Sequence, residues 1–162
     1  MNRGKGEGGW GKREGGRGTD SAAALALRVL AVLMGVFFFF EAMGKLAWIG
    51  DSAILAGRLQ GYLENSNSLG RWYLETIAMP GVPAFARIVF LGELAAGLAL
   101  LAGFWTRLAA ALAFLMVMNF HVASGALFQY SFLTNGYGLP VLSGLLALAI
   151  GGRNLPFSVS RS

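Results

Sequence analysis

Four stretches of apolar residues, separated by segments of glycine, proline and polar residues, dominate the pattern of the chain. They cover about 22–43, 84–102, 107–127 and 136–151. A helix that crosses the hydrocarbon core of a bilayer needs about 20 mostly apolar residues. The pattern therefore predicts an all-α membrane protein whose fold is a bundle of four transmembrane helices, the last of them the shortest.

The segment at 46–83 is the only one between the predicted spans that is long enough to have structure of its own. We predict a helix over 53–64 with Ser52 as its N-cap, a break at 65–68 and a second short amphipathic helix over 71–79. One face of the first helix is apolar at i, i+4 and i+7, through Leu55, Leu59 and Tyr62. We expect this extracytoplasmic amphipathic helical hairpin between spans one and two to lie on the outer membrane surface as a lid. An irregular loop with scattered aromatic residues is the alternative.

The two ends of the chain are polar. Residues 1–20 combine eight glycines with charges of both signs and have no apolar periodicity, which predicts a disordered, basic, cytoplasmic tail. The apolar stretch that follows is too long for a signal peptide and has no clear small-residue cleavage site, so we expect it to be retained as the first span. The four-helix membrane domain is then predicted to cover 21–155, followed by a short C-terminal tail at 156–162.

Composition and charge agree with a membrane class. The chain is 56% hydrophobic and 13% charged, with a mean hydropathy of +0.59. Its net charge of +5 does not indicate a nucleic-acid partner, because the cations are concentrated at both ends and at Arg107 between the second and third spans. By the positive-inside rule both termini are cytoplasmic, and the expected location is the inner membrane of a bacterial or archaeal cell.

The counts of cysteine and histidine restrict the chemistry that the chain can carry. The absence of cysteine excludes iron–sulfur clusters and thiolate metal sites built from this chain alone. The single histidine, His121, argues against a bis-His haem. No metal site is predicted.

Glu93 lies inside the apolar stretch RIVFLGELAAGLALLAGFWTR, where its carboxylate must be paired, protonated or exposed to a polar cavity. At about 1.5 Å per residue Glu93 lies near the middle of its span, and Arg28 lies about a third of the way along the first span. An extended arginine side chain can bridge that offset, which makes an Arg28–Glu93 pair feasible. Two alternatives remain: Arg28 extends to the cytoplasmic headgroups and leaves Glu93 neutral, or the pair only holds the bundle together.

Five further residues complete the candidate intramembrane polar site. Glu41 and Lys45 are spaced i, i+4 at the outer end of span one, in the order that favours an intrahelical pair. Asn119 and His121 lie in the outer half of span three, and Tyr137 lies at the outer end of span four. With the phenylalanine run of span one as an apolar slot, His121, Lys45, Tyr137 and Glu93 suit a quinone headgroup, which needs hydrogen-bond donors at its carbonyls and one group that exchanges protons. The alternatives are an ordinary helix-end pair and a histidine that only bonds a neighbour.

The second span also carries a family resemblance. It resembles the DoxX family of small four-helix bacterial and archaeal membrane proteins in the run Glu93-x-x-x-Gly97-x-x-Leu100-x-x-Gly103-x-x-Thr106-Arg107. The first span is similar to the family pattern in Arg28, Gly35, Phe38 and Lys45-Leu46, and the last in Tyr137-Gly138, Leu148 and Gly152-Arg153. The resemblance covers about 22–155. Two features depart from the pattern, namely Ala42 in place of a frequent glycine and the ending GRNLPFSVS.

The resemblance implies a four-helix fold and an association with membrane redox chemistry. Some members are the small subunit of a thiosulfate:quinone oxidoreductase, others accompany thiol-handling or superoxide-handling enzymes, and many have no assigned activity. We therefore expect an integral membrane subunit of a larger complex that contributes to a quinone-linked redox site, with other membrane or peripheral subunits as partners. A non-catalytic accessory or assembly subunit and a small-solute or proton pathway are the alternatives.

Overall fold

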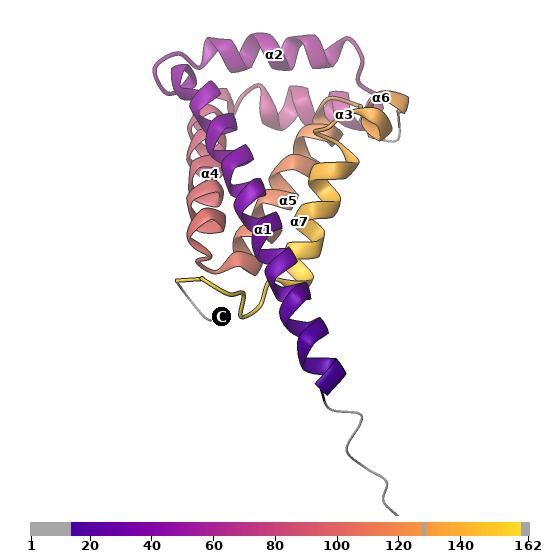
Figure 1. The fold of residues 1–162 in the computed structure, drawn as a ribbon. Helices are drawn as coiled ribbons and strands as arrows, with labels where there is room; N and C mark the ends of the chain where they lie inside the picture. The colour runs from indigo at the N-terminus through magenta and orange to yellow at the C-terminus, as the bar shows by residue number, and fades with distance from the viewer. Residues whose placement is uncertain (1–13, 128, 160–162) are drawn as a thin grey trace, which may run out of the picture.

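The structure, a computed structural model, describes residues 14–127 and 129–159, and within these it contains helices and connecting loops only. The helices α1, α4, α5 and α7 run side by side along a bundle, and α2 lies across one end (Figure 1). We call that end the lid end, and the opposite end, where α4 turns into α5, the turn end. The elements are α1 (Glu14–Gly44), the 3-10 helix η1 (Leu46–Ile49), α2 (Ala53–Leu63), α3 (Ser68–Tyr73), the π-helical η2 (Leu74–Ala78), α4 (Val82–Ala102), α5 (Thr106–Ala123), α6 (Tyr130–Thr134) and α7 (Leu139–Gly151).

Three helices of the described chain are long and apolar enough to cross a membrane, namely α1 from Asp20 onward, α4 and α5. The predicted all-α membrane protein is therefore confirmed. The fourth helix, α7, has only 13 residues, or about 20 Å of rise. It starts at Leu139 instead of 136 because the preceding residues form a turn, in which Gly138 N donates to Asn135 Oδ1 at 2.6 Å.

Helix α1 begins at Glu14, so the predicted disorder of the N-terminal tail is wrong for residues 14–20. Residues 1–13 lie outside the described part of the chain. Extending a helix that already exists adds one hydrogen bond per residue without a new nucleation step, so the glycines of this stretch do not end it. The 31 residues of α1 rise about 46 Å, and its first turns project beyond the turn end of the bundle (Figure 1).

Left-handed glycines end the second and third long helices. Gly103 follows α4 with a φ of 69°, and Phe104 N donates to Ala99 O at 2.8 Å, which confirms the predicted end of this helix. The predicted third span continued to 127, but α5 ends at Ala123 because Gly125 has a φ of 67°. The chain then forms the short helix α6, which the sequence pattern did not predict as a separate element.

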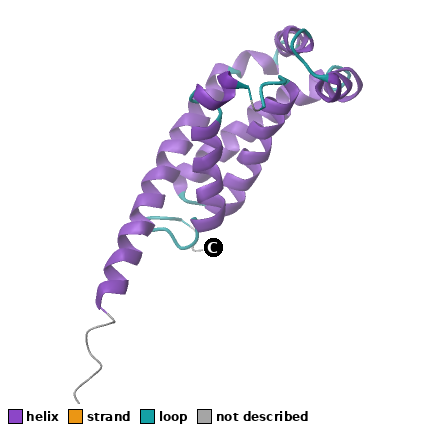
Figure 2. Ribbon diagram, turned by 90° about the vertical axis from the view of Figure 1, so that its right-hand side faces the viewer, coloured by secondary structure: helices purple, strands orange, loops and turns teal. Residues whose placement is uncertain are grey.

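The lid consists of η1, α2, α3 and η2. In Figure 2 the helices that lie across the bundle in Figure 1 are seen nearly end-on, beside the top of the bundle. Leu55 and Leu59 of α2 are buried, whereas Arg58 and Glu64 are exposed, as the predicted amphipathic face requires. The predicted pair of lid helices is therefore confirmed.

The caps of the lid helices differ from the prediction. Ser52 is the N-cap residue of α2, but its side chain makes no cap bond, and Asp51 Oδ1 accepts from Ala53 N at 2.9 Å. The second helix starts at Ser68 instead of 71 because Asn67 Oδ1 accepts a hydrogen bond from Gly70 N at 2.8 Å.

Close contact between α1 and α4 depends on two glycines. A Cβ atom at Gly97 would lie 2.7 Å from Phe39 N, and one at Gly35 would lie 2.9 Å from Gly97 O. Small residues allow helix backbones to approach within a membrane, where close packing drives the association of helices. This crossing fixes the register of α1 against α4, and with it the level of every polar side chain on the two helices.

Buried apolar side chains form two clusters. The bundle cluster fills the space between α1, α4, α5 and α7 and includes Phe38, Leu100, Leu145 and Leu148. The lid cluster joins the lid to the start of α4 and includes Trp48, Leu55, Leu59, Leu74 and Val89.

Candidate functional site

Lys45, the residue after α1, is the centre of a buried group of charges. Its Nζ atom lies 2.8 Å from Glu41 Oε2 and 2.7 Å from Glu93 Oε2, and it also donates to the backbone oxygen of Glu41 at 3.2 Å. Lys45 and Glu93 are only 7% and 6% exposed. An ammonium group has three N–H donors, so one lysine can serve two carboxylates. The predicted Glu41–Lys45 pair is confirmed, and Glu93 joins it to form what we call the Lys45 cluster.

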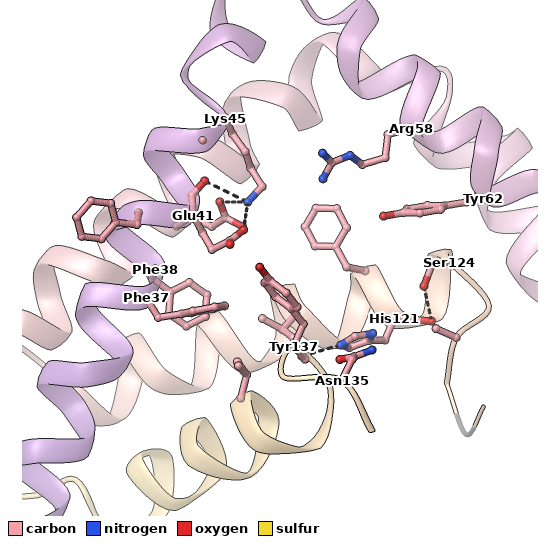
Figure 3. Close-up of a pocket in the computed structure, with 17 residues that line it drawn as sticks. Phe37, Phe38, Glu41, Lys45, Arg58, Tyr62, His121, Ser124, Asn135 and Tyr137 are labelled. Atoms are coloured by element: carbon pink, nitrogen blue, oxygen red, sulfur yellow. Dashed lines mark hydrogen bonds and ion pairs between the residues drawn. The ribbon is translucent and has the colours of Figure 1, made fainter. Parts of the chain in front are cut away.

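A cavity of about 570 Å³ separates the Lys45 cluster from the lid. The cluster lies on one wall, His121 and Tyr137 lie on the opposite wall, and the lid covers the space from above (Figure 3). The remaining surface is largely aromatic, with Phe37, Phe38, Phe40 and Phe120. The cavity therefore has polar groups on several sides, with aromatic surface between them.

Hydrogen bonds around α5 hold His121 in place. Its Nε2 lies 2.9 Å from the backbone oxygen of Tyr137 and donates to it, because a carbonyl can only accept. The imidazole ring also meets Phe132 edge-on, with 4.9 Å between ring centres. The hydroxyl of Tyr137 points toward the Lys45 cluster across the cavity (Figure 3).

Two residues of the lid belong to the cavity and were missed by the sequence reasoning. Arg58 and Tyr62 of α2 both line it, and their guanidinium and hydroxyl groups point into the space (Figure 3). The Arg58 guanidinium also lies over the ring of Trp48, 5.2 Å from its centre. Their i, i+4 spacing places both on one side of α2, which is the signal that would have found them.

Arg28 does not pair with Glu93. Its NH1 donates to Leu100 O at 2.9 Å and its NH2 to Leu101 O at 2.7 Å, so it caps the last turn of α4. From the crossing of Gly35 and Gly97, Arg28 lies seven residues toward the turn end and Glu93 lies four residues toward the lid end. At about 1.5 Å per residue the two levels differ by about 16 Å, which is beyond the reach of an arginine. The predicted Arg28–Glu93 pair is wrong because the start of α1 projects beyond the bundle, so Arg28 is level with the last turn of α4 and not a third of the way along it.

Replacing Arg28 with methionine should leave two carbonyls of α4 without their donor. We expect the free energy of unfolding to fall by about 1–3 kcal/mol, measured by denaturation in mild detergent. In a double-mutant cycle Arg28→Met and Glu93→Gln should be additive within about 0.5 kcal/mol, because the sites share no partner. A larger coupling would show that the two side chains interact after all.

Asn119 also lies away from the cavity. It lines a separate space of about 30 Å³ with Leu55, Leu59 and Phe85, on the lid-cluster side of α5. Residues two positions apart in a helix point about 200° away from each other around the axis, so Asn119 and His121 face different neighbours.

Of the seven candidate residues, the structure brings together Glu41, Lys45, Glu93, His121 and Tyr137, and it places Arg28 and Asn119 elsewhere. No group of three or more His, Asp or Glu side chains suited to a metal ion occurs in the part of the chain that the structure describes.

Comparison with known protein families matches residues 23–125 to DoxX, which is more than half of the chain. The chain belongs to the DoxX family. The matched DoxX region contains the whole Lys45 cluster and His121 and ends before Tyr137. The comparisons with curated proteins and with solved structures gave no match.

The structure gives a physical role to several residues of the DoxX pattern. Gly35 and Gly97 form the helix crossing, Gly103 ends α4, and Arg28 caps the same helix end. Ala42, which replaces a frequent glycine, is fully buried. Part of the pattern therefore describes how α1 and α4 pack, and its members Phe38, Lys45, Glu93 and Tyr137 line the cavity.

Proposed function

We propose that the cavity beneath the lid binds a quinone headgroup, and that this DoxX protein acts as an integral subunit of a larger membrane redox complex. The observation that carries the proposal is the Lys45 cluster, a set of paired charges at the wall of a cavity whose lining combines polar and aromatic side chains. A quinone headgroup has the same division, with polar carbonyls on a flat apolar ring.

The side chains around the cavity suit the chemistry of a quinone. Arg58 and Tyr137 offer hydrogen-bond donors from opposite sides, and the phenylalanines of α1 offer ring contacts. Reduction of a quinone to a quinol takes up two electrons and two protons. Glu41, whose side chain is 32% exposed, can exchange protons between the cavity and its surroundings. The electrons would come from a partner subunit, because the sequence has no cysteine and one histidine.

Removing the Tyr137 hydroxyl should weaken quinone binding with little effect on the fold. We expect Tyr137→Phe and His121→Ala each to raise the Kd of a short-chain benzoquinone by about tenfold, measured by equilibrium binding to the purified protein. Tyr130→Phe is the matched control, because Tyr130 is 82% exposed and does not line the cavity. Unchanged quinone affinity in both cavity variants, together with unchanged quinone-dependent turnover of the native complex in Glu93→Gln, would reject the proposal.

A non-catalytic accessory subunit is the second candidate. It is favoured by the position of the Lys45 cluster at the contact of α1 and α4, where the charges can act purely to hold two helices together. In that case cavity variants leave quinone turnover unchanged while variants of the cluster destabilise the bundle. A solute or proton pathway is less favoured, because fully buried Leu100, Leu145 and Leu148 fill the interior between the cavity and the turn end.

A further inference from the structure

We propose that the turn end of the bundle binds an anionic phospholipid, with its phosphate against Arg107 and one acyl chain in a groove between α4 and α5. This site is separate from the cavity beneath the lid and does not depend on the function proposed for it. Two adjoining hollows on the surface and the distribution of charge carry the inference.

The first hollow is a groove of about 430 Å³ between the start of α5 and the end of α7. It is lined by Trp105, Arg107, Leu108, Ala111 and Ala149. Arg107 Nε donates to Ala149 O at 3.0 Å, which holds the guanidinium against the end of α7. Arg107 forms no ion pair with any carboxylate among the described residues. A guanidinium held in this way can bind phosphate through its two terminal nitrogens.

The second hollow, of about 250 Å³, continues from the same place along α4 and α5. It shares Trp105 and Leu108 with the first, and its floor consists of small residues, among them Gly92, Ala95 and Ala99. From Trp105 to Met116 at its far end the helix rises about 16 Å. Half of a hydrocarbon core of about 30 Å is about 15 Å, so this apolar groove has the length of one acyl chain in a leaflet.

The charges of the described chain select an anionic lipid. Glu41 and Glu93 lie near the lid end, and Asp51, Glu64 and Glu75 belong to the lid. At the turn end the acidic residues of the described chain are Glu14 and Asp20, on the part of α1 that projects beyond the bundle (Figure 1). Arg107 and Arg153 are both exposed there. An anionic headgroup complements the exposed positive charge of these two arginines.

Native mass spectrometry of the full-length protein, stripped of lipid and titrated with defined lipids, tests the inference. We expect phosphatidylglycerol to be retained at one tight site about fivefold more strongly than phosphatidylcholine with the same chains. Arg107→Gln should remove this preference, and Arg107→Lys should keep most of it. Ala95→Leu, which fills the apolar groove, should weaken retention of both lipids equally. Inorganic phosphate should not displace the bound lipid.

Arg87→Gln is the matched control, because Arg87 is an exposed arginine at the opposite end of α4 that donates to Pro83 O. It should leave the lipid preference unchanged. An equal loss in Arg87→Gln would show a general effect of surface charge and would overturn the proposal. An unchanged preference in Arg107→Gln, or a lipid-free dimer that occupies the groove, would also overturn it.

Discussion

Replacing Lys45 with methionine is expected to remove a large part of the protein's stability. The ammonium of Lys45 is the partner of both Glu41 and Glu93, and Glu93 is 6% exposed. Removing one member of a buried ion pair lowers stability by about 3–5 kcal/mol, because it leaves an unpaired charge in a medium of low dielectric. Total stability is commonly about 5–15 kcal/mol, so a loss of this size is a large part of it. The measurement is denaturation of the purified protein in mild detergent.

A matched surface variant serves as the control for Lys45→Met, and a combined variant tests whether the unpaired charges cause the loss of stability. Arg71→Met breaks the exposed Arg71–Glu75 pair, whose atoms are 3.7 Å apart, and should change stability by less than about 1 kcal/mol. Combining Lys45→Met with Glu41→Gln and Glu93→Gln removes all the charges and should recover much of the lost stability. If Lys45→Met unfolds as readily as Arg71→Met does, the Lys45 cluster does not stabilise the bundle.

Replacing Gly97 with leucine should separate α1 from α4. A Cβ atom at Gly97 would lie 2.7 Å from Phe39 N and 3.1 Å from Gly35 O, and both are backbone atoms that can move only with the whole helix. Overpacking of a core typically lowers stability by about 1–3 kcal/mol, and a backbone obstruction should reach or exceed the upper end of this range. Thermal unfolding followed by circular dichroism in detergent measures the loss.

Gly57→Ala in α2 is the control for this substitution, because no atom lies within 4 Å of the position where its Cβ would be. Alanine should raise stability there by up to about 1 kcal/mol, since it favours a helix more than glycine does. Wild-type stability in Gly97→Leu would mean that the two helices do not cross at this glycine.

The sequence pattern predicted helices and their ends well where a local signal exists. Gly103 marked the end of α4, and the spacing of Leu55 and Leu59 marked the buried face of α2. Such signals depend on residues that are close in the sequence, so the packing of the rest of the chain does not change them. At the start of α1, Asp20 and Ser21 are suitable N-cap residues and the composition before them suggested disorder, but the helix begins earlier, at Glu14.

Contacts between helices were harder to predict, because they depend on register. Arg28 and Glu93 were placed together from depth alone, but the Gly35–Gly97 crossing puts Arg28 beside the end of α4 and Glu93 beside Lys45. An error of a few residues in a helix start moves a side chain by several ångströms. The place of Arg58 at the cavity could not be predicted from the bundle helices, since it depends on how the lid folds over them.

Two cations, Arg28 in α1 and Lys45 directly after it, have consequences for how the protein is made. Arg28 donates to carbonyls of residues 100 and 101, and Lys45 pairs with Glu93 as well as with Glu41 of α1, so Arg28 finds these acceptors, and Lys45 its second carboxylate, only in a helix that is synthesised later. Until then each must stay hydrated, with its long side chain extended to the membrane surface. The nascent chain can therefore bury these charges only when α4 docks onto α1. Assembly of the bundle cannot be completed before that step.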